Sequence, residues 1–249
     1  MSRAAYDEIA DWYDEALRTG PLGLFQDLAI SIVLDLAGEV ENRRICDLAC
    51  SQGILSRHLA KLGAAVTGVD VSDKMLDLAR CYEQEEPRGI NYVRSDARSL
   101  PEVPDGAFEG LACNLALMDI SDLEATLHTV ARVLRTGGWF VFSITHPCFP
   151  TPSLGWTSRV DSEEKPEIPN YFAEGFWRRA NPEGVRGKVG FHHRTMSTYV
   201  NALALSGLGI DHLVEPRATG ALAERIPGYR EVPPFLVARC KRDLAPAES

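Results

Sequence analysis

The 249-residue sequence contains no long uninterrupted hydrophobic run and no excess of positive charge. Its longest apolar stretch, residues 22–37, is interrupted by Gln26, Asp27 and Asp35, which makes it too polar to cross a bilayer. The first residues carry several acids, which is not the pattern of a secretory signal peptide. The formal net charge of −9 opposes association with phosphate backbones. We therefore expect neither a membrane nor a nucleic acid as a partner.

The six cysteines lack the paired spacing of zinc sites and of disulfide-stapled small domains. His146, Cys148 and His192 likewise have no recognised metal-ligand spacing. Cys46 and Cys113 lie in apolar runs, where free cysteine behaves as a small buried hydrophobe. The sequence therefore predicts no bound metal, and it predicts a reducing compartment, the cytoplasm.

Between residues 40 and 146, apolar strand-like runs alternate with amphipathic helical segments. The expected strands are 44–49, 65–70, 90–96, 108–116 and 139–146, and the expected helices are 54–62, 73–84 and 121–134. Ser72 is placed to cap the second helix, and Ser121 with Glu124 forms a capping box for the third, which Gly137 and Gly138 end. Because strands separated by helices indicate βαβ units, we predict an α/β fold with a mostly parallel sheet.

Residues 147–191 interrupt this alternation. They are rich in proline, glycine, aromatic and charged residues, and they are too many for an ordinary loop in a compact domain. We interpret them as a functional insertion. A helix over 196–205 and strands over 210–214 and 235–240 are expected after it, and helices over 6–17 and 22–37 before the alternation.

Small and polar residues gather where the expected strands end. The loop Asp47-Leu-Ala-Cys-Ser-Gln-Gly53 follows the first strand, and its small residues let backbone approach a ligand at a helix N-terminus. Asp70 ends the second strand, where an acid can accept from ribose hydroxyls. Asp96 ends the third, where it can accept from an adenine amino group, and Asn114 ends the fourth. Each acid alone could merely cap a helix, but together at one sheet edge they predict a nucleoside site.

These residues resemble the class I S-adenosylmethionine (SAM)-dependent methyltransferases, whose first loop reads acid-x-Gly-x-Gly-x-Gly and whose second and third strands are each followed by an acid. The resemblance covers residues 40–146 and, more loosely, 196–240. It implies a Rossmann-like α/β/α fold with a seven-stranded, mostly parallel sheet whose last strand is antiparallel, and it implies SAM as cofactor. The implied cofactor-binding residues are Tyr13, Asp47, Ala49, Cys50, Ser51, Gly53, Asp70, Val71, Met75, Asp96, Ala97, Asn114 and Leu115.

The segment Tyr6–Asp14 also resembles the N-terminal lid helix of many small-molecule methyltransferases, although an ordinary packing helix has the same pattern. The resemblance thus implies a single domain over 1–249. It consists of a helical lid (1–38), a core (39–146 and 192–242) and a substrate cap (147–191).

The loop departs from the family pattern at two positions, because Ala49 and Ser51 stand where the first two glycines are usual. A side chain at Ser51 would crowd the methionine part of SAM or demand an unusual backbone angle. The same departures separate the loop from nicotinamide-binding proteins, which need Gly-x-Gly-x-x-Gly to approach a pyrophosphate.

Three histidines are candidates for a general base that takes a proton from the acceptor. His146 ends the fifth strand, and His192 and His193 lead into the helix after the insertion. Arg194 could hold a substrate carboxylate or phosphate, or form a salt bridge. Tyr171 and Trp177 are candidate substrate contacts among the aromatic residues of the cap, which could instead form the cap's own small core.

The sequence therefore predicts an enzyme that methylates a small organic acceptor, more readily at an oxygen of an apolar or aromatic metabolite than at nitrogen or carbon. Two alternatives remain open. One is a methyltransferase that modifies tRNA or protein, and the other is a SAM-binding module without catalysis. A monomer or a homodimer is expected.

Overall fold

The computed structural model describes residues 4–149, 171–178 and 182–242. In chain order its elements are η1 (Ala5–Glu8), α1 (Ala10–Thr19), α2 (Pro21–Ala37), β1 (Arg44–Leu48), α3 (Ile54–Lys61), β2 (Ala65–Asp70), α4 (Asp73–Glu85), β3 (Asn91–Arg94), β4 (Phe108–Asn114), η2 (Leu117–Asp119), α5 (Leu123–Val133), β5 (Leu134–Thr145), β6 (Gly175–Trp177), α6 (Val185–Lys188), β7 (Phe191–His193), α7 (Met196–Leu205), β8 (Leu208–Val214), α8 (Gly220–Arg225), η4 (Pro227–Arg230) and β9 (Phe235–Arg242).

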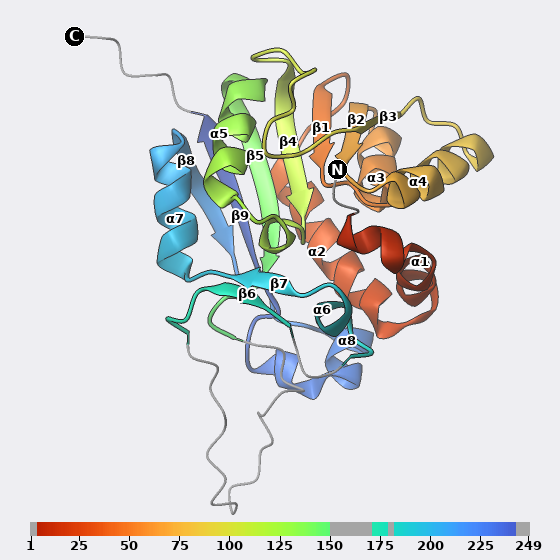
Figure 1. The fold of residues 1–249 in the computed structure, drawn as a ribbon, viewed down its shortest axis with the longest axis vertical. Helices are drawn as coiled ribbons and strands as arrows, with labels where there is room; N and C mark the ends of the chain where they lie inside the picture. The colour runs from red at the N-terminus through yellow and green to blue at the C-terminus, as the bar shows by residue number, and fades with distance from the viewer. Residues whose placement is uncertain (1–3, 150–170, 179–181, 243–249) are drawn as a thin grey trace, which may run out of the picture.

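A seven-stranded sheet in the order β3-β2-β1-β4-β5-β9-β8 forms the centre of the molecule (Figure 1). Strands β1 to β5 are parallel, and β9 runs antiparallel to both β5 and β8. This confirms the expected α/β fold and its antiparallel last strand. Asp47 lies opposite Gly68 of β2 and Ala112 of β4, so the carboxyl ends of the three strands reach the same edge of the sheet.

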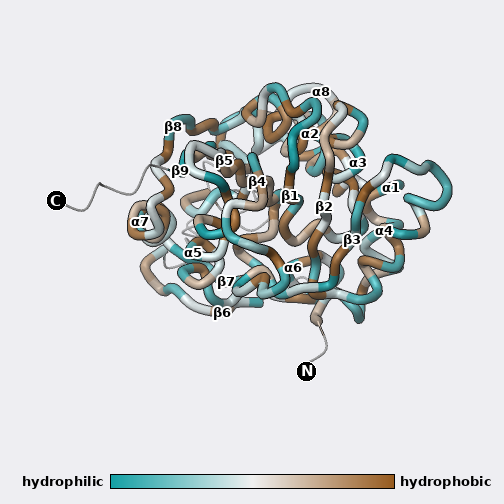
Figure 2. The backbone as a smooth tube through the Cα atoms, turned by 90° about the horizontal axis from the view of Figure 1, so that it is seen from above, coloured by the Kyte–Doolittle hydropathy of each residue, from teal (hydrophilic) through white to brown (hydrophobic). Residues whose placement is uncertain are grey.

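Helices cover both faces of this sheet, because successive strand residues point to opposite sides. Ile45 and Trp139 pack with α2 and α3 on one face. Cys46 and Phe140 pack with α5 and α7 on the other. Hydrophobic stretches of the chain lie mainly in the interior, and many of the outer connections are hydrophilic (Figure 2). All six cysteines are free thiols.

The predicted cap of α4 is confirmed, but two predictions about the ends of α5 are wrong. Ser72 does cap α4, accepting from the Met75 N–H at 3.2 Å. The cap of α5, however, is Asp122, whose Oδ1 accepts from the Ala125 N–H at 2.9 Å. The predicted capping box at Ser121 is therefore wrong by one residue. Gly137 and Gly138 do not end the helix either, because β5 already begins at Leu134 beside Phe108.

The chain before β1 and the segment between β5 and α7 meet at the carboxyl edge of the sheet. The first contributes η1, α1 and α2, and the second contributes the β6–β7 hairpin and α6 (Figure 1). Part of the expected cap, residues 150–170 with Trp156, lies outside the described residues. In the described part of the chain no single helix is long and apolar enough to span a membrane, and α1 with most of α2 meets that test only as a pair bent by 80°.

Candidate active site

A pocket opens at the carboxyl ends of β1, β2 and β4. Its volume is about 190 Å³, far more than the roughly 10–15 Å³ that one ordered water needs by the same measure, so it has room for a small molecule. Ten of the residues expected to bind cofactor line it: Tyr13, Asp47, Ala49, Cys50, Ser51, Asp70, Val71, Met75, Asn114 and Leu115.

The loop after β1 keeps a glycine-like backbone without the usual glycines. The φ angles of Ala49, Ser51 and Gly53 are 56°, 52° and 78°, all in the left-handed region. The unusual backbone angle expected at Ser51 is therefore present. Two bonds hold the loop in this conformation: Cys50 N–H donates to the Val69 carbonyl at 2.9 Å, and Ser51 N–H donates to Asp70 Oδ2 at 2.8 Å.

Two acids face the pocket from the ends of β1 and β2. Asp47 is buried, and its Oδ2 accepts from Ser56 Oγ at 2.5 Å. Burial raises the pKa of Asp47 to about 7, although the Ser56 hydrogen bonds oppose this shift. Burial also raises the pKa of Asp70, against the backbone N–H groups of Ser72 and Ser51 that donate to it.

Asn114, at the end of β4, brings a polar group without a partner to the pocket. Its Oδ1 accepts from Ser143 Oγ at 2.6 Å, which fixes the orientation of the side-chain amide. Among the described residues, its buried Nδ2 has no hydrogen-bond partner. A buried amide donor left unpaired costs about 1–3 kcal/mol, so a ligand that accepts from it would be favoured.

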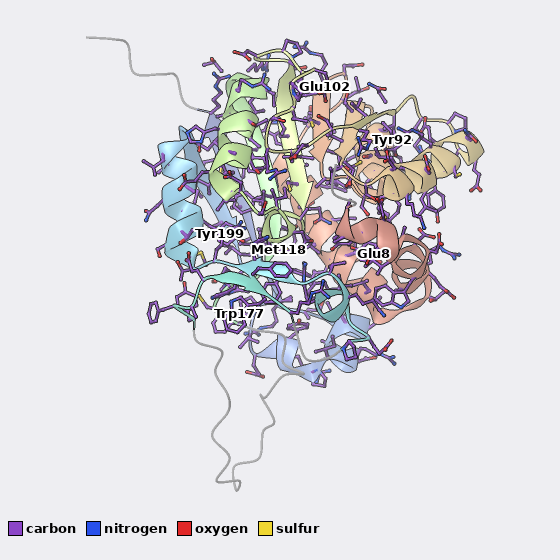
Figure 3. The ribbon with its side chains drawn as sticks, viewed as in Figure 1. Glu8, Tyr92, Glu102, Met118, Trp177 and Tyr199 are labelled. Carbon is purple, nitrogen blue, oxygen red and sulfur yellow. The ribbon has the colours of Figure 1, made fainter. Side chains whose placement is uncertain are left out.

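Apart from Tyr13, the outer wall of the pocket and its supports consist of residues that were not predicted as site residues. Tyr6 of η1 donates to Asp119 Oδ2 at 2.9 Å, and Arg186 of α6 pairs with the other oxygen of Asp119. Phe176 and Phe191 of the β6–β7 hairpin complete this wall. Figure 3 shows Met118, next to Asp119 on η2, beside this hairpin, with which η2 is in contact. These residues lie far apart in the chain, so no local sequence pattern predicts that they form one site. The only available signal was that Asp119 follows the predicted site residue Asn114 by five positions.

Several known proteins with similar sequences and structures are methyltransferases. A family model described as a methyltransferase domain matches residues 46–142. A ubiquinone biosynthesis O-methyltransferase from Bordetella avium is 31% identical over 134 residues, which are 54% of this chain and 56% of that protein. The chain thus spans about half the length of the curated relatives it matches. A crystal structure of a SAM-dependent methyltransferase from Mesorhizobium loti is 33% identical, covers 91% of this chain and 100% of that chain, and has a TM-score of 0.72.

The chain belongs to the SAM-dependent methyltransferases. A solved structure of a [4+2]-cyclase has the same fold, with a TM-score of 0.68 over 98% of each chain, but only 15% identity. The fold alone therefore does not decide the reaction, and the pocket must be tested against the cofactor of the family.

The pocket of this methyltransferase fits SAM in three respects. Asp70 accepts from the backbone N–H groups of Ser72 and Ser51, with Val71 as a further backbone donor, and its carboxylate retains acceptor capacity for a ribose hydroxyl. The unpartnered amide nitrogen of Asn114 can donate to a carboxylate. Asp70 has no paired cation among the described residues, so it favours a ligand that carries positive charge, and the sulfonium of SAM supplies it.

Three residues predicted to bind cofactor do not line the pocket. The carboxylate of Asp96 is held by Arg98, with Nη2 at 2.6 Å from Oδ2, and Arg98 lowers its pKa. Ala97 follows it in the same turn. Gly53, at the end of the loop, packs against Tyr92 instead: a Cβ atom added to Gly53 would come within 2.2 Å of the Tyr92 hydroxyl. The Ser95 N–H donates to the Asp70 carbonyl at 3.0 Å, so the turn that contains Asp96 lies beside Asp70. An adenine contact by Asp96 stays a prediction.

The three candidate histidines do not line the pocket either. His146 is buried, accepts from the Cys148 N–H at 3.2 Å through Nδ1 and lies 2.7 Å from Glu215 Oε1 through Nε2. His193 Nε2 lies 2.8 Å from the Tyr171 carbonyl. His192 contacts the Phe176 ring, and burial lowers its pKa. Hydrogen bonds engage the ring nitrogens of His146 and His193 away from the pocket, whereas His192 packs behind Phe176 of the pocket wall. A catalytic role for any of the three stays a prediction.

The predicted substrate residues have structural partners instead. The Arg194 guanidinium donates to the carbonyls of Leu117, Ile120 and Ser121 at 2.6–3.0 Å, so its fork holds η2 and the two residues after it. A role for Arg194 in binding an anion stays a prediction. The Tyr171 hydroxyl accepts from the Met196 N–H at 2.7 Å. Trp177 donates to the Ala173 carbonyl at 3.1 Å and is exposed. None of the three lines the pocket, and Phe176 and Phe191 lie there in their place.

Proposed function

We propose that this protein transfers a methyl group from SAM to a small organic acceptor, at an oxygen of an apolar or aromatic metabolite. The observation that carries the proposal is the pocket itself. Asp47, Asp70 and Asn114 line its floor at three adjacent strand ends, and aromatic residues from both the N-terminal segment and the β6–β7 hairpin line its outer wall. The names of the curated O-methyltransferase relatives support oxygen as the acceptor atom.

In this proposal each part of the pocket has a separate task. SAM supplies an activated methyl group that transfers in line to a nucleophile. Asp70 binds the ribose, Asp47 and the loop from Ala49 to Gly53 hold the methionine part, and Asn114 donates to its carboxylate. Tyr6, Phe176 and Phe191 exclude water and orient an apolar acceptor. A cytoplasmic location is part of the same proposal, because the spacing of the six cysteines is not that of a disulfide framework.

The first test is whether the full chain binds SAM. We expect calorimetry to show binding, and we expect Asp70→Ala to weaken it by roughly 10- to 100-fold, because a hydrogen bond to a charged group contributes about 1.5–3 kcal/mol. His193→Ala should leave SAM affinity nearly unchanged, since His193 does not line the pocket. Absence of SAM binding, or equal losses in the two variants, would contradict the proposal.

The acceptor class is tested by turnover. The protein is incubated with SAM and a panel of phenols and other hydroxylated metabolites, and S-adenosylhomocysteine is measured. Formation of this product with a panel member excludes a purely SAM-binding module. Salt-dependent binding of bulk tRNA, with methyl transfer to it, would instead favour the macromolecular alternative.

A further inference from the structure

A short series of hydrogen bonds connects the N-terminal segment to the predicted ribose acid. Asp7 of η1 is buried, and its Oδ1 accepts from Ser72 Oγ at 2.5 Å and from the Lys74 N–H at 3.2 Å. The Ser72 N–H donates to Asp70 Oδ1 at 2.8 Å. Asp70 Oδ2 accepts from the Ser51 N–H at 2.8 Å. We call this series, Asp7–Ser72–Asp70–Ser51, the relay.

Asp7 acts in the relay as a second cap of α4. Ser72 already accepts from the Met75 N–H, and Asp7 accepts from the next free donor of the same helix end, that of Lys74. Its negative charge also lies at the positive end of the helix dipole. The turn between β2 and α4 is therefore fixed from outside, by a residue 65 positions earlier in the chain than Ser72.

This turn decides where the carboxylate of Asp70 lies. Asp70 and Ser72 are two residues apart, and the bond between the Ser72 N–H and Asp70 Oδ1 closes the turn. Loss of Asp7 frees the Ser72 hydroxyl and leaves the Lys74 N–H without its acceptor. The turn then loosens, and with it the orientation of Asp70 and its bond to the loop that contains Ser51.

The N-terminal segment has another anchor on α4 that does not lead to the pocket. Asp14 of α1 accepts from the Tyr82 hydroxyl at 2.9 Å and from Arg18 Nε at 3.2 Å. Tyr82 lies toward the opposite end of α4 from Ser72. Both aspartates therefore attach the segment, but of the two only Asp7 contacts a residue that holds Asp70.

We propose that Asp7 is a positioning residue for cofactor binding. Through Ser72 it holds Asp70 and the loop after β1 in the conformation that binds the nucleoside, so docking of the N-terminal segment and cofactor binding stabilise each other. This inference rests on the proposed role of Asp70 as the ribose acid.

The test is a double-mutant cycle on binding of S-adenosylhomocysteine, measured by calorimetry with the full chain. This probe lacks the sulfonium charge, so a change of charge at Asp7 does not by itself alter its attraction. Asp7→Asn should weaken binding about 5- to 30-fold, within the usual range of coupling between sites. In an Asp70→Asn background the same substitution should have little further effect, because the residue through which it acts is already lost.

Two matched variants separate this role from general loss of structure. Glu8→Gln removes the same charge from an exposed neighbour in η1 (Figure 3), and it should leave binding unchanged. Asp14→Asn loosens the other anchor and should weaken binding much less than Asp7→Asn. Ser72→Ala interrupts the relay from the other side and gives a second cycle if Asp7→Asn folds poorly.

The possible failures are distinguishable. If Asp70→Asn alone leaves binding unchanged, the proposed ribose role of Asp70 is wrong. If Asp70→Asn weakens binding, the proposed function stands, and three results would then overturn the positioning role of Asp7. Asp7→Asn could leave binding unchanged, it could weaken binding no more than Asp14→Asn does, or its effect could add in full to that of Asp70→Asn.

Discussion

Ala49 and Ser51 hold the left-handed backbone conformation that glycine adopts most readily. Each holds a left-handed φ, which costs an L-residue roughly 1–2 kcal/mol. In this conformation the N–H groups of Cys50 and Ser51 donate to the Val69 carbonyl and to Asp70, and these bonds offset part of the cost. Strain of this kind gathers at ligand sites, where the surrounding structure fixes the chain. The two residue types are visible in the sequence, but the left-handed conformation of their backbone is not.

Two separate substitutions in this loop, Ala49→Gly and Gly53→Ala, should therefore change the free energy of unfolding in opposite directions. Ala49→Gly relieves the strain and adds chain entropy to the unfolded state, so we expect a gain of about 0.5–1 kcal/mol in the free energy of unfolding. Gly53→Ala should lose roughly 2–3 kcal/mol, because φ is 78° and the new Cβ would meet the Tyr92 hydroxyl at 2.2 Å. Urea unfolding measures both, and a loss of stability in Ala49→Gly would show that the position is unstrained.

At the scale of elements, η2 depends on a residue from the far side of the cap. This turn follows β4 and supplies Asp119 to the pocket, and Arg194 holds three of the carbonyls in and beside it. The sequence suggested an anion-binding role for Arg194 because a guanidinium suits carboxylate and phosphate. Its actual partners are backbone carbonyls 73–77 positions away, which no local pattern reveals.

Substitution of Arg194 should destabilise the protein through η2. We expect Arg194→Met to lower the free energy of unfolding by roughly 2–4 kcal/mol, since three buried or half-buried carbonyls lose a charged donor. Arg194→Lys should recover only part of this loss, because an ammonium cannot reproduce the planar fork. The exposed Arg178→Met serves as control. A stable Arg194→Met protein that fails to bind an anionic substrate would restore the original interpretation.

At the scale of the whole molecule, burial of acids at the sheet edge links stability to pH. The pKa of Asp47 is raised to about 7 from an ordinary value near 3.9, so the folded state keeps a proton that the unfolded state releases. Stability therefore falls as pH rises from about 4 to about 7 and stays lower above that range. The raised pKa values of Asp70 and Asp119 act with the same sign.

Removal of this buried charge should remove part of the pH dependence. Asp47→Asn should become more stable relative to the original protein between pH 5 and pH 8, by on the order of 2 kcal/mol. Thermal or urea unfolding at several pH values measures this difference. The exposed Glu102→Gln should show no such trend. A constant difference between Asp47→Asn and the original protein across this range would mean that Asp47 is already ionised at pH 5.

The sequence by itself determined the order and type of the main elements and the floor of the pocket. Strand ends carry local signals, and parallel strands bring those ends together, so Asp47, Asp70 and Asn114 could be assigned to one site. Tertiary structure alone decided the outer wall and the supports. Tyr6, Asp119, Arg186 and Phe191 come together because the N-terminal segment and the segment between β5 and α7 fold over the same edge of the sheet. Arg194, His146 and His193 are hydrogen-bonded to structural partners. Contacts between segments so distant in the chain depend on packing, which leaves no periodic signal in the sequence.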